Sequence, residues 1–262
     1  MSVPVPDYVE GHGLLKGRSV LITAAAGVGI GFAAAKKAVE EGCRAIFISD
    51  IHERRLGEAA DRLKALAPST PVFRQVCNVT DEGQVQALVA AAEEKLGGID
   101  VLINNAGLGG LKNVVDMSDE EWLKVIDVTL TGTMRMTRAA LKVMIPRKRG
   151  AIVNNASVLG WRAQKGQSHY AAAKAGVMAF TRCSGLEAAE HGIRVNAVSP
   201  SIAMHDFLKK ASTPEELEAL SKVEAFGRAA EVWEVANVMM FLASDYAGYM
   251  VGEIVSVSSQ RA

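Results

Sequence analysis

The sequence predicts an α/β fold in which a doubly wound, parallel sheet of seven strands carries helices on both faces. Short apolar runs rich in β-branched residues alternate with longer segments of helical periodicity. The runs are hydrophobic almost throughout, which is typical of strands covered on both faces. No internal repeat, low-complexity tract or linker divides the 262 residues, so we expect a single domain over 1–262.

The expected strands and helices alternate along the chain. Seven strands are predicted at 19–23, 45–49, 71–76, 101–106, 151–156, 194–199 and 253–258. Helices are predicted at 30–41, 53–66, 81–96, 119–144, 168–190 and 231–243. This order favours right-handed crossovers between parallel strands.

Two segments do not fit the alternation. Residues 1–17 contain several glycines and prolines and are expected to form an N-terminal arm. Residues 201–228 interrupt the last strand–helix unit, and within them Thr213 suits a helix N-cap and Pro214 the first helical position. Ligands of open α/β sheets bind beyond the carboxyl ends of the strands, so we expect this insertion to be a substrate lid.

The bulk composition argues against several classes of protein. The formal net charge is zero, so neither a nucleic-acid nor an anionic-membrane partner is expected. No apolar run reaches the ~18 residues of a membrane span, and the N-terminus lacks a secretory-signal pattern. The cysteines Cys43, Cys77 and Cys183 have no metal-binding spacing. We expect a cytoplasmic protein with reduced thiols and no metal site.

A glycine-rich segment, TAAAGVGIG at 23–31, follows the first strand and opens the first helix. Amides at a helix N-terminus carry partial positive charge and bind phosphate. Gly29 and Gly31 would allow close backbone approach, and Gly27 would allow a tight turn. By itself the segment is equally consistent with a flexible turn.

The second strand ends in Asp50, about 20 residues beyond the glycines, where an acid is expected to bind the adenosine ribose hydroxyls. A carboxylate there repels a 2′-phosphate, which favours NAD over NADP. The following segment contains Arg54 and Arg55, so NADP stays open if an arginine faces the ribose. These charges are also consistent with a solvated helix start.

Three residues form a candidate catalytic set. Tyr170 and Lys174 are four residues apart on a predicted helix and therefore share a face. A nearby ammonium stabilises a phenolate and lowers the tyrosine pKa toward a value useful for proton transfer. Ser157 follows a predicted strand, where its hydroxyl could bind a substrate carbonyl as negative charge develops.

With these motifs in place, the chain resembles the short-chain dehydrogenase/reductase superfamily from about Leu15 to Ser258. The resemblance rests on the glycine loop, NNAG at 104–107, Ser157, YAAAK at 170–174, NAVSP at 196–200 and the segment from Phe226 to Glu253. It implies a Rossmann-type, NAD(P)-dependent oxidoreductase. It also implies a homo-oligomer, with a tetramer expected.

The resemblance assigns roles to individual residues. It makes Tyr170 the general acid/base, Lys174 the partner that binds the nicotinamide ribose, and Ser157 the group that polarises the carbonyl. The adenosine side of the cofactor would be lined in part by the NNAG segment, and the carboxamide flanked by residues after the sixth strand. The full expected cofactor set is Thr23, Ala25, Gly27, Gly29, Ile30, Asp50, Asn78, Val79, Asn104, Ala106, Gly107, Tyr170, Lys174, Pro200 and Ile202.

The chain also departs from the family pattern. Thr129 stands where the family has a catalytic asparagine; a threonine is expected to be too short to shape the same water-holding helix kink, which would reroute or weaken the proton relay. Asn78 replaces an acid, and Ser201 replaces a glycine. The glycine loop is one residue longer than usual, with Ala24 in place of its first glycine.

The substrate pocket is expected between Ser157, Tyr170 and the lid. Its candidate walls are Leu108, Leu159, Trp161, Met204, Phe207 and Leu208, each of which could equally be ordinary core. Arg162, Lys165, Lys209 and Lys210 could bind an anionic tail such as a CoA phosphate, or could be solvated charges.

The segments 154–184 and 197–208, together with TAAAG at 23–27, show a narrower resemblance to actinobacterial dehydrogenases of cholesterol breakdown. This resemblance suggests NAD-dependent oxidation of a fused-ring hydroxy acyl-CoA, such as a hydroxylated octahydroindene-carboxyl-CoA. Two alternatives stay open. One is an NADPH-dependent reductase of 3-oxoacyl thioesters or other carbonyl compounds. The other is a non-catalytic nucleotide-sensing or scaffold protein on the same fold.

Overall fold

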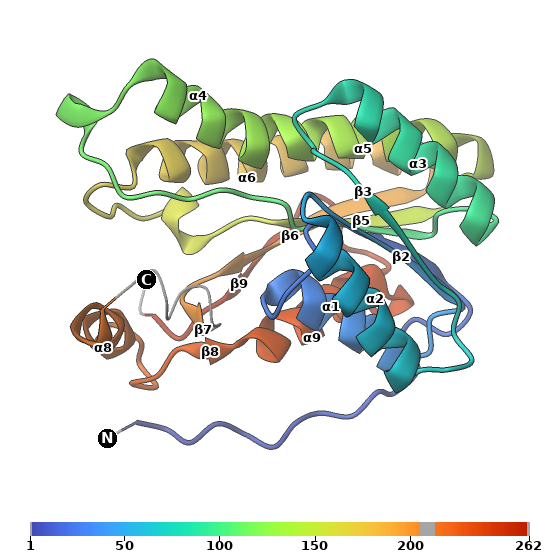
Figure 1. Cartoon of the computed structure of the whole chain (residues 1–262), viewed down its shortest axis with the longest axis horizontal. Coiled ribbons are helices and arrows are strands. Elements are labelled where there is room, and N and C mark those ends of the chain that lie inside the picture. The colour runs from blue at the N-terminus through green and yellow to red at the C-terminus, as the bar shows by residue number, and fades with distance from the viewer. Residues whose placement is uncertain (1, 205–212, 261–262) are drawn as a thin grey trace.

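The computed structural model describes residues 2–204 and 213–260, and its largest feature is the predicted sheet. Seven strands pair in parallel in the order β3-β2-β1-β4-β5-β6-β9 (Figure 1). They are β1 (Ser19–Ile22), β2 (Ala45–Asp50), β3 (Val72–Val76), β4 (Val101–Asn104), β5 (Gly150–Asn155), β6 (Ile193–Pro200) and β9 (Ile254–Val257). The doubly wound, seven-stranded prediction is confirmed, and each strand lies within two residues of its expected bounds.

Helices cover both faces of the sheet (Figure 1). One face carries α1 (Ile30–Glu40), α2 (Glu53–Leu66) and α9 (Val232–Ala243), whose buried residues form one apolar core with β1 and β2. The other face carries α3 (Glu82–Leu96), α4 (Asp119–Ile126), α5 (Gly132–Met144) and α6 (Ser168–Ala189), with a second core beneath them. None of the helices within the described ranges is long and apolar enough to cross a membrane.

The helix expected at 119–144 is not continuous. A capping box formed by Ser118 and Glu121 begins α4. A π-helical turn, Asp127–Thr131, then separates α4 from α5. The prediction of one regular helix was therefore wrong, because apolar periodicity does not reveal a local change in the backbone hydrogen-bonding pattern.

Shorter elements connect these layers. The helix α8 (Pro214–Lys222) lies where the sequence predicted a small helix, and residues 205–212 of the proposed lid lie outside the described residues. Two short strands that were not predicted, β7 (Ala203–Met204) and β8 (Ala230–Glu231), pair in parallel before and after the segment that contains α8. Single 3₁₀ turns occupy η1 (Val114–Asp116), η3 (Ile145–Arg147), η4 (Val158–Gly160) and η5 (Asp245–Ala247).

The N-terminal arm runs along the outside of α1 and α9 toward the segment before β8 (Figure 1). Lys37 of α1 is fully buried and donates from Nζ to the carbonyl of Val9 at 2.5 Å. The Glu41 carboxylate accepts from the backbone amides of His12 and Leu14 at 2.8 and 3.0 Å. Polar groups buried beneath the arm therefore fix it to the domain.

We expect Lys37→Ala to destabilise the folded protein by about 3 kcal/mol, because it removes a buried cation that lies 3.5 Å from Glu40 and 4.0 Å from Glu41. Chemical denaturation measures the change. The matched control is Lys36→Ala, on the same helix turn, whose partly exposed ammonium lies 3.6 Å from Glu40. Its loss should cost less than about 1 kcal/mol. Equal losses in the two variants would contradict the role given to the buried lysine.

Candidate active site

The carboxyl ends of β1, β4 and β5 meet at one edge of the sheet and bring the predicted motifs together. The Thr23 hydroxyl oxygen accepts from the backbone amides of Asn105 and Ala106 at 3.0 and 3.1 Å. One strand farther on, Asn104 of β4 pairs in register with Asn154 of β5. The glycine loop, the NNAG segment and the segment leading to Ser157 are therefore neighbours.

The glycine loop has the geometry of a tight turn into a helix. Gly27 has a φ of 92°, and Arg62 donates to its carbonyl at 3.1 Å. Gly29 is the N-cap of α1. A Cβ on Gly31 would lie 2.1 Å from the carbonyl oxygen of Ala24, so no side chain fits there. These features provide the close backbone approach and the helix N-terminus that a pyrophosphate requires.

Asp50 lies at the end of β2, beside this loop. Its carboxylate accepts from the backbone amide of Ala26 at 3.1 Å and from that of His52 at 3.0 Å. Burial raises the pKa of Asp50, and the amide of Ala26 and the positive charge of Arg55 act in the opposite direction. The carboxylate is thus held in a fixed orientation at the position where a ribose is expected.

The three predicted catalytic residues also converge. Ser157 follows β5, is nearly buried, and accepts from the amide of Leu159 at 3.2 Å. Lys174 Nζ lies 5.5 Å from the centre of the Tyr170 ring, as their four-residue spacing on α6 predicts. The ammonium does not reach outward, however, but donates to the backbone carbonyl of Asn155.

The electrostatics correct one expectation. Burial lowers the pKa of Lys174 to about 8. Burial also raises the pKa of Tyr170, and a hydrogen bond with Ser157 only opposes this rise. The prediction that the lysine lowers the tyrosine pKa was wrong for this arrangement, because desolvation of the phenolate dominates and the Lys174 ammonium is engaged by Asn155.

Thr129 corrects a second expectation. It is fully buried in the π-helical turn between α4 and α5. The helix is therefore irregular at this position, although a threonine was expected to be too short to shape such a kink. The Thr129 hydroxyl accepts from the amide of Leu108 at 2.9 Å and donates to the carbonyl of the same residue at 3.1 Å. One hydroxyl thus fixes the loop that follows the NNAG segment.

Other predicted cofactor residues differ in what they contact. The Asn104 amide points into the domain and donates to Thr137 and Asn154, both at 2.9 Å. The Asn78 side chain accepts from the amide and hydroxyl of Thr80. The buried Val79 packs where a side chain on Gly132 would clash. The remaining members lie along the same edge of the sheet, and their contacts with a cofactor stay predictions; these are Ala25, Ile30, Gly107, Pro200 and Ile202.

The predicted substrate residues are only partly brought together. Leu159 and the half-exposed Trp161 follow Ser157, and Met204 lies in β7. The guanidinium of Arg162 donates to the side chain and backbone of Gln260, and its contact with an anion stays a prediction. The predicted residues Phe207, Leu208, Lys209 and Lys210 lie outside the described residues.

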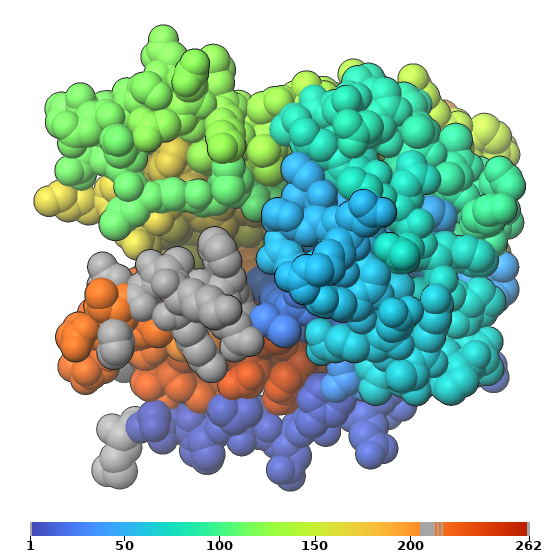
Figure 2. Space-filling view, in the orientation of Figure 1, coloured from blue at the N-terminus to red at the C-terminus, as the bar shows by residue number. Residues whose placement is uncertain are grey.

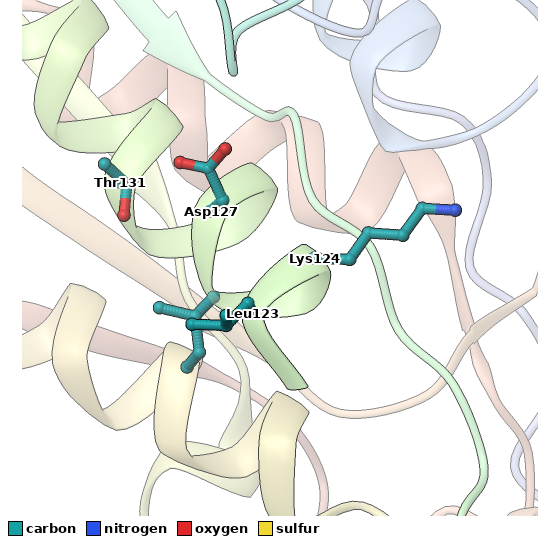
Figure 3. Close-up of a pocket in the computed structure, with 5 residues that line it drawn as sticks. Leu123, Lys124, Asp127 and Thr131 are labelled. Carbon is teal, nitrogen blue, oxygen red and sulfur yellow. The ribbon is translucent and has the colours of Figure 1, made fainter. Parts of the chain in front are cut away.

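Two hollows accompany the site. One, of about 350 Å³, is lined by Leu123, Lys124, Ile126, Asp127 and Thr131, and includes none of the predicted site residues (Figure 3). The other, of about 680 Å³, is lined by Leu111, Lys112, Asn113, Asp116, Lys165 and Gly166. Its walls are the loop after β4 and the loop before α6, which lie close together on the face seen in Figure 2. They are joined by a 2.8 Å bond from the Lys112 amide to the Gly166 carbonyl.

Three residues that connect the site were not predicted from the sequence. Asn155 Nδ2 donates to Asn105 Oδ1 at 2.9 Å, and Asn105 Nδ2 donates to the Ala24 carbonyl at 3.0 Å. Arg62 holds the glycine turn from α2. A signal for the two asparagines exists, because the same tripeptide, NNA, spans the carboxyl ends of both β4 and β5.

Comparisons with known proteins agree with this geometry. Residues 24–259 match the family model described as enoyl-(acyl carrier protein) reductase. The chain is 58% identical over 257 residues to the (5R,7aS)-5-hydroxy-7a-methyl-1-oxo-2,3,5,6,7,7a-hexahydro-1H-indene-carboxyl-CoA reductase of Mycobacterium tuberculosis, covering 98% of this chain and 97% of that protein. It is 37% identical over 243 residues to the 3-oxoacyl-(acyl-carrier-protein) reductase FabG of Thermotoga maritima, covering 93% and 97%. A solved short chain dehydrogenase from Mycobacterium smegmatis superposes with a TM-score of 0.88 at 57% identity, covering 99% of each chain.

The lowered pKa of Lys174 predicts a pH-dependent stability. Its pKa falls from 10.5 when unperturbed to about 8 in the folded protein, so between these values the unfolded chain binds more protons and stability rises with pH. Below pH 8 the buried charge costs up to about 3 kcal/mol. We therefore expect Lys174→Met to be more stable than the parent protein at pH 7, with a gap that closes toward pH 10.5.

Chemical denaturation at pH 7, 8, 9 and 10 measures this gap. The control is Lys142→Met, which changes an exposed lysine on α5 and removes no buried charge. A Lys174→Met variant that is less stable at pH 7, by an amount independent of pH, would contradict the argument.

Proposed function

The chain belongs to the short-chain dehydrogenase/reductase family, and we propose that it transfers a hydride between a nicotinamide cofactor and a secondary alcohol on a fused-ring acyl-CoA. The observation that carries this proposal is the assembly of Ser157, Tyr170 and Lys174 beside a glycine loop that has no room for a side chain at Gly31. Phosphates suit the N-terminus of α1, and a ribose suits the fixed carboxylate of Asp50.

In the direction of oxidation, the carbinol carbon loses a hydride and its hydroxyl loses a proton. The bound nicotinamide supplies the hydride acceptor. Ser157 donates a hydrogen bond to the substrate oxygen and orients it. Tyr170 takes the hydroxyl proton on its phenolic oxygen, and the ammonium of Lys174 favours the ionised phenol once it turns from Asn155 toward the tyrosine. Reduction runs through the same atoms in reverse.

Two observations support a CoA thioester as the substrate. The Mycobacterium tuberculosis relative is named for a hexahydroindene-carboxyl-CoA, a ring with two hydrogens fewer than the octahydroindene that the sequence suggested. In this chain, the loop that passes Tyr170 at Gly109 continues directly into the 680 Å³ hollow, whose lining includes Lys112 and Lys165. The ammonium of Lys112 already forms an ion pair with the carboxylate of Glu121 at 3.2 Å. Lys165 is therefore the stronger candidate to bind a phosphate of CoA.

The direction of the reaction depends on the tyrosine. The sequence suggested oxidation with NAD, whereas the Mycobacterium tuberculosis relative is named a reductase. The raised pKa of Tyr170 keeps the phenol protonated near neutral pH, which favours proton donation to a ketone. We propose that oxidation accelerates with rising pH as the phenol ionises. The FabG relative keeps a second candidate open, reduction of a 3-oxoacyl thioester.

Oligomeric state and compartment stay proposals. The apolar residues Val115, Trp122 and Leu123 near α4 are partly or largely exposed, which supports a homotetramer assembled through this flank. A light-scattering mass tests it. We also propose a cytoplasmic location, tested by fractionation of the native cell.

The function is tested by turnover of bicyclic hydroxy and oxo acyl-CoA thioesters with NAD or NADH, beside 3-hydroxyacyl-CoAs and hydroxysteroids. We expect the bicyclic thioesters to give the highest kcat/KM. Tyr170→Phe should lower kcat at least 100-fold with unchanged NADH affinity, because only the proton-transfer group is lost. Unchanged turnover in Tyr170→Phe would refute the role of Tyr170. NADH binding without turnover of any substrate in the parent protein would favour a non-catalytic, nucleotide-sensing protein, and a preference for linear 3-oxoacyl thioesters would favour the second candidate.

Cofactor choice is tested at Asp50. We propose NAD, because a fixed carboxylate beside the ribose repels a 2′-phosphate. Asp50→Ala removes both the acceptor and the repulsion, so the ratio of kcat/KM for NAD over NADP should fall at least tenfold. Asp61→Ala, which changes an exposed acid on α2, is the control and should leave the ratio unchanged. The same ratio in Asp50→Ala as in the parent protein would refute this role.

A further inference from the structure

The loop after β1 contains an alanine in a conformation that suits glycine. Ala24 has a φ of 50°, in the left-handed region where a side chain crowds the following carbonyl. Such a conformation persists only where surrounding contacts enforce it. Ala24 also stands at the position where the family pattern has glycine, so something in this chain must replace the freedom that glycine would provide.

Two asparagine side chains provide that enforcement. Asn105 Nδ2 donates to the Ala24 carbonyl oxygen at 3.0 Å. Asn155 Nδ2 donates to Asn105 Oδ1 at 2.9 Å. An amide presents its oxygen and its nitrogen on opposite sides, so occupation of the Asn105 oxygen by Asn155 turns the Asn105 nitrogen toward Ala24. Asn155 therefore determines the orientation of the bond that holds the loop.

The bridge touches both halves of the site. A Cβ on Gly31 would lie 2.1 Å from the Ala24 oxygen and 2.4 Å from Asn105 Nδ2, so the bridge packs directly on the first turn of α1. The backbone carbonyl of Asn155 accepts from Lys174 Nζ. A shift of Ala24 would therefore displace the first turn of α1, where phosphates are proposed to bind. The other end of the bridge, at Asn155, contacts Lys174.

Asn155 is poorly explained as a residue that stabilises the fold. Its Oδ1 is buried and has no hydrogen-bond partner among the residues described, which is unfavourable for stability. Its neighbour Asn154 is fully buried, and both ends of its amide are bonded, to Asn104 and to Thr181 at 2.9 Å each. Asn154 thus has the bonding of a residue that stabilises the fold. Asn155 instead orients Asn105 and leaves its own Oδ1 buried without a partner among the residues described.

We propose that Asn155 is a positioning residue which, through Asn105, holds Ala24 in its left-handed conformation and so shapes the cofactor loop in place of the missing glycine. The effect on cofactor affinity rests on the proposed nicotinamide binding. The conformational bridge itself does not depend on that proposal, and the two are tested separately.

The affinity test uses Asn155→Val, Ala24→Gly and the double variant, with NADH as the fluorescent probe. Asn155→Val should weaken NADH binding by roughly 3- to 10-fold, the equivalent of one hydrogen bond. Ala24→Gly should bind within about twofold of the parent protein, because glycine adopts the same conformation without strain. In the double variant glycine makes the bridge dispensable, so its affinity should return to within about twofold of Ala24→Gly.

Asn154→Val is the matched control. It should lower the melting temperature, since it removes two buried hydrogen bonds, and Ala24→Gly should not restore that loss. If Asn155→Val does not fold, Asn155→Asp replaces it, because the aspartate keeps the shape but sets a second acceptor against Asn105 Oδ1. Unchanged NADH affinity in the Asn155 variant, or a double variant that binds as weakly as the single one, would overturn the proposed effect on the cofactor loop.

The bridge is tested without cofactor by the same cycle in melting temperature. Ala24→Gly should raise the melting temperature more in the Asn155→Val background than in the parent protein, because only there is the strain of Ala24 unopposed. Equal increments would overturn the bridge. A parent protein that does not bind NADH would instead contradict the proposed function, and the melting cycle would still decide the role of Asn155.

Discussion

The parallel pairing of β4 with β1 on one side and with β5 on the other is the constraint on which the candidate site depends. Parallel strands end at the same edge of the sheet, and their crossovers place helix N-termini there as well. This order sets the glycine loop after β1 beside the NNAG segment after β4 and Ser157 after β5. The Thr23 hydroxyl, which accepts from Asn105 and Ala106, then joins the first two of these segments directly.

What the sequence could predict follows from this geometry. Strand order and helix spacing were enough to bring Tyr170 near Lys174 and to place Asp50 beside the loop, because periodicity fixes which side chains share a face or an edge. The immediate partners were not accessible in the same way. Lys174 is bound by the backbone carbonyl of Asn155, and backbone acceptors leave no trace in the amino-acid pattern. Interruption of the helix at the π turn had no signal in the apolar spacing either.

Thr129 illustrates why residue type alone misled. The expectation considered the length of the side chain, and a threonine is shorter than the asparagine of the family. Hydrogen-bonding capacity was the property that mattered, since a hydroxyl donates and accepts at once, as an amide does. The amide and the carbonyl of Leu108 both lie within hydrogen-bond distance of the Thr129 hydroxyl, so the short threonine satisfies both. These bonds fix the loop after the NNAG segment, which passes beside Lys174 at Gly107.

Burial acts on the two ionisable groups of the candidate catalytic set in opposite senses, raising the pKa of Tyr170 and lowering that of Lys174. Both shifts favour the neutral form, whereas base catalysis by the tyrosine requires a phenolate beside an ammonium. Ser157 opposes the tyrosine shift, and the carbonyl of Asn155 competes with the tyrosine for the ammonium. In the proposed mechanism, ionisation of Tyr170 therefore requires Lys174 to turn from Asn155 toward the phenol. Asn155, which orients Asn105 toward the glycine loop, thus also binds Lys174, so the loop and the candidate catalytic pair share one structural element.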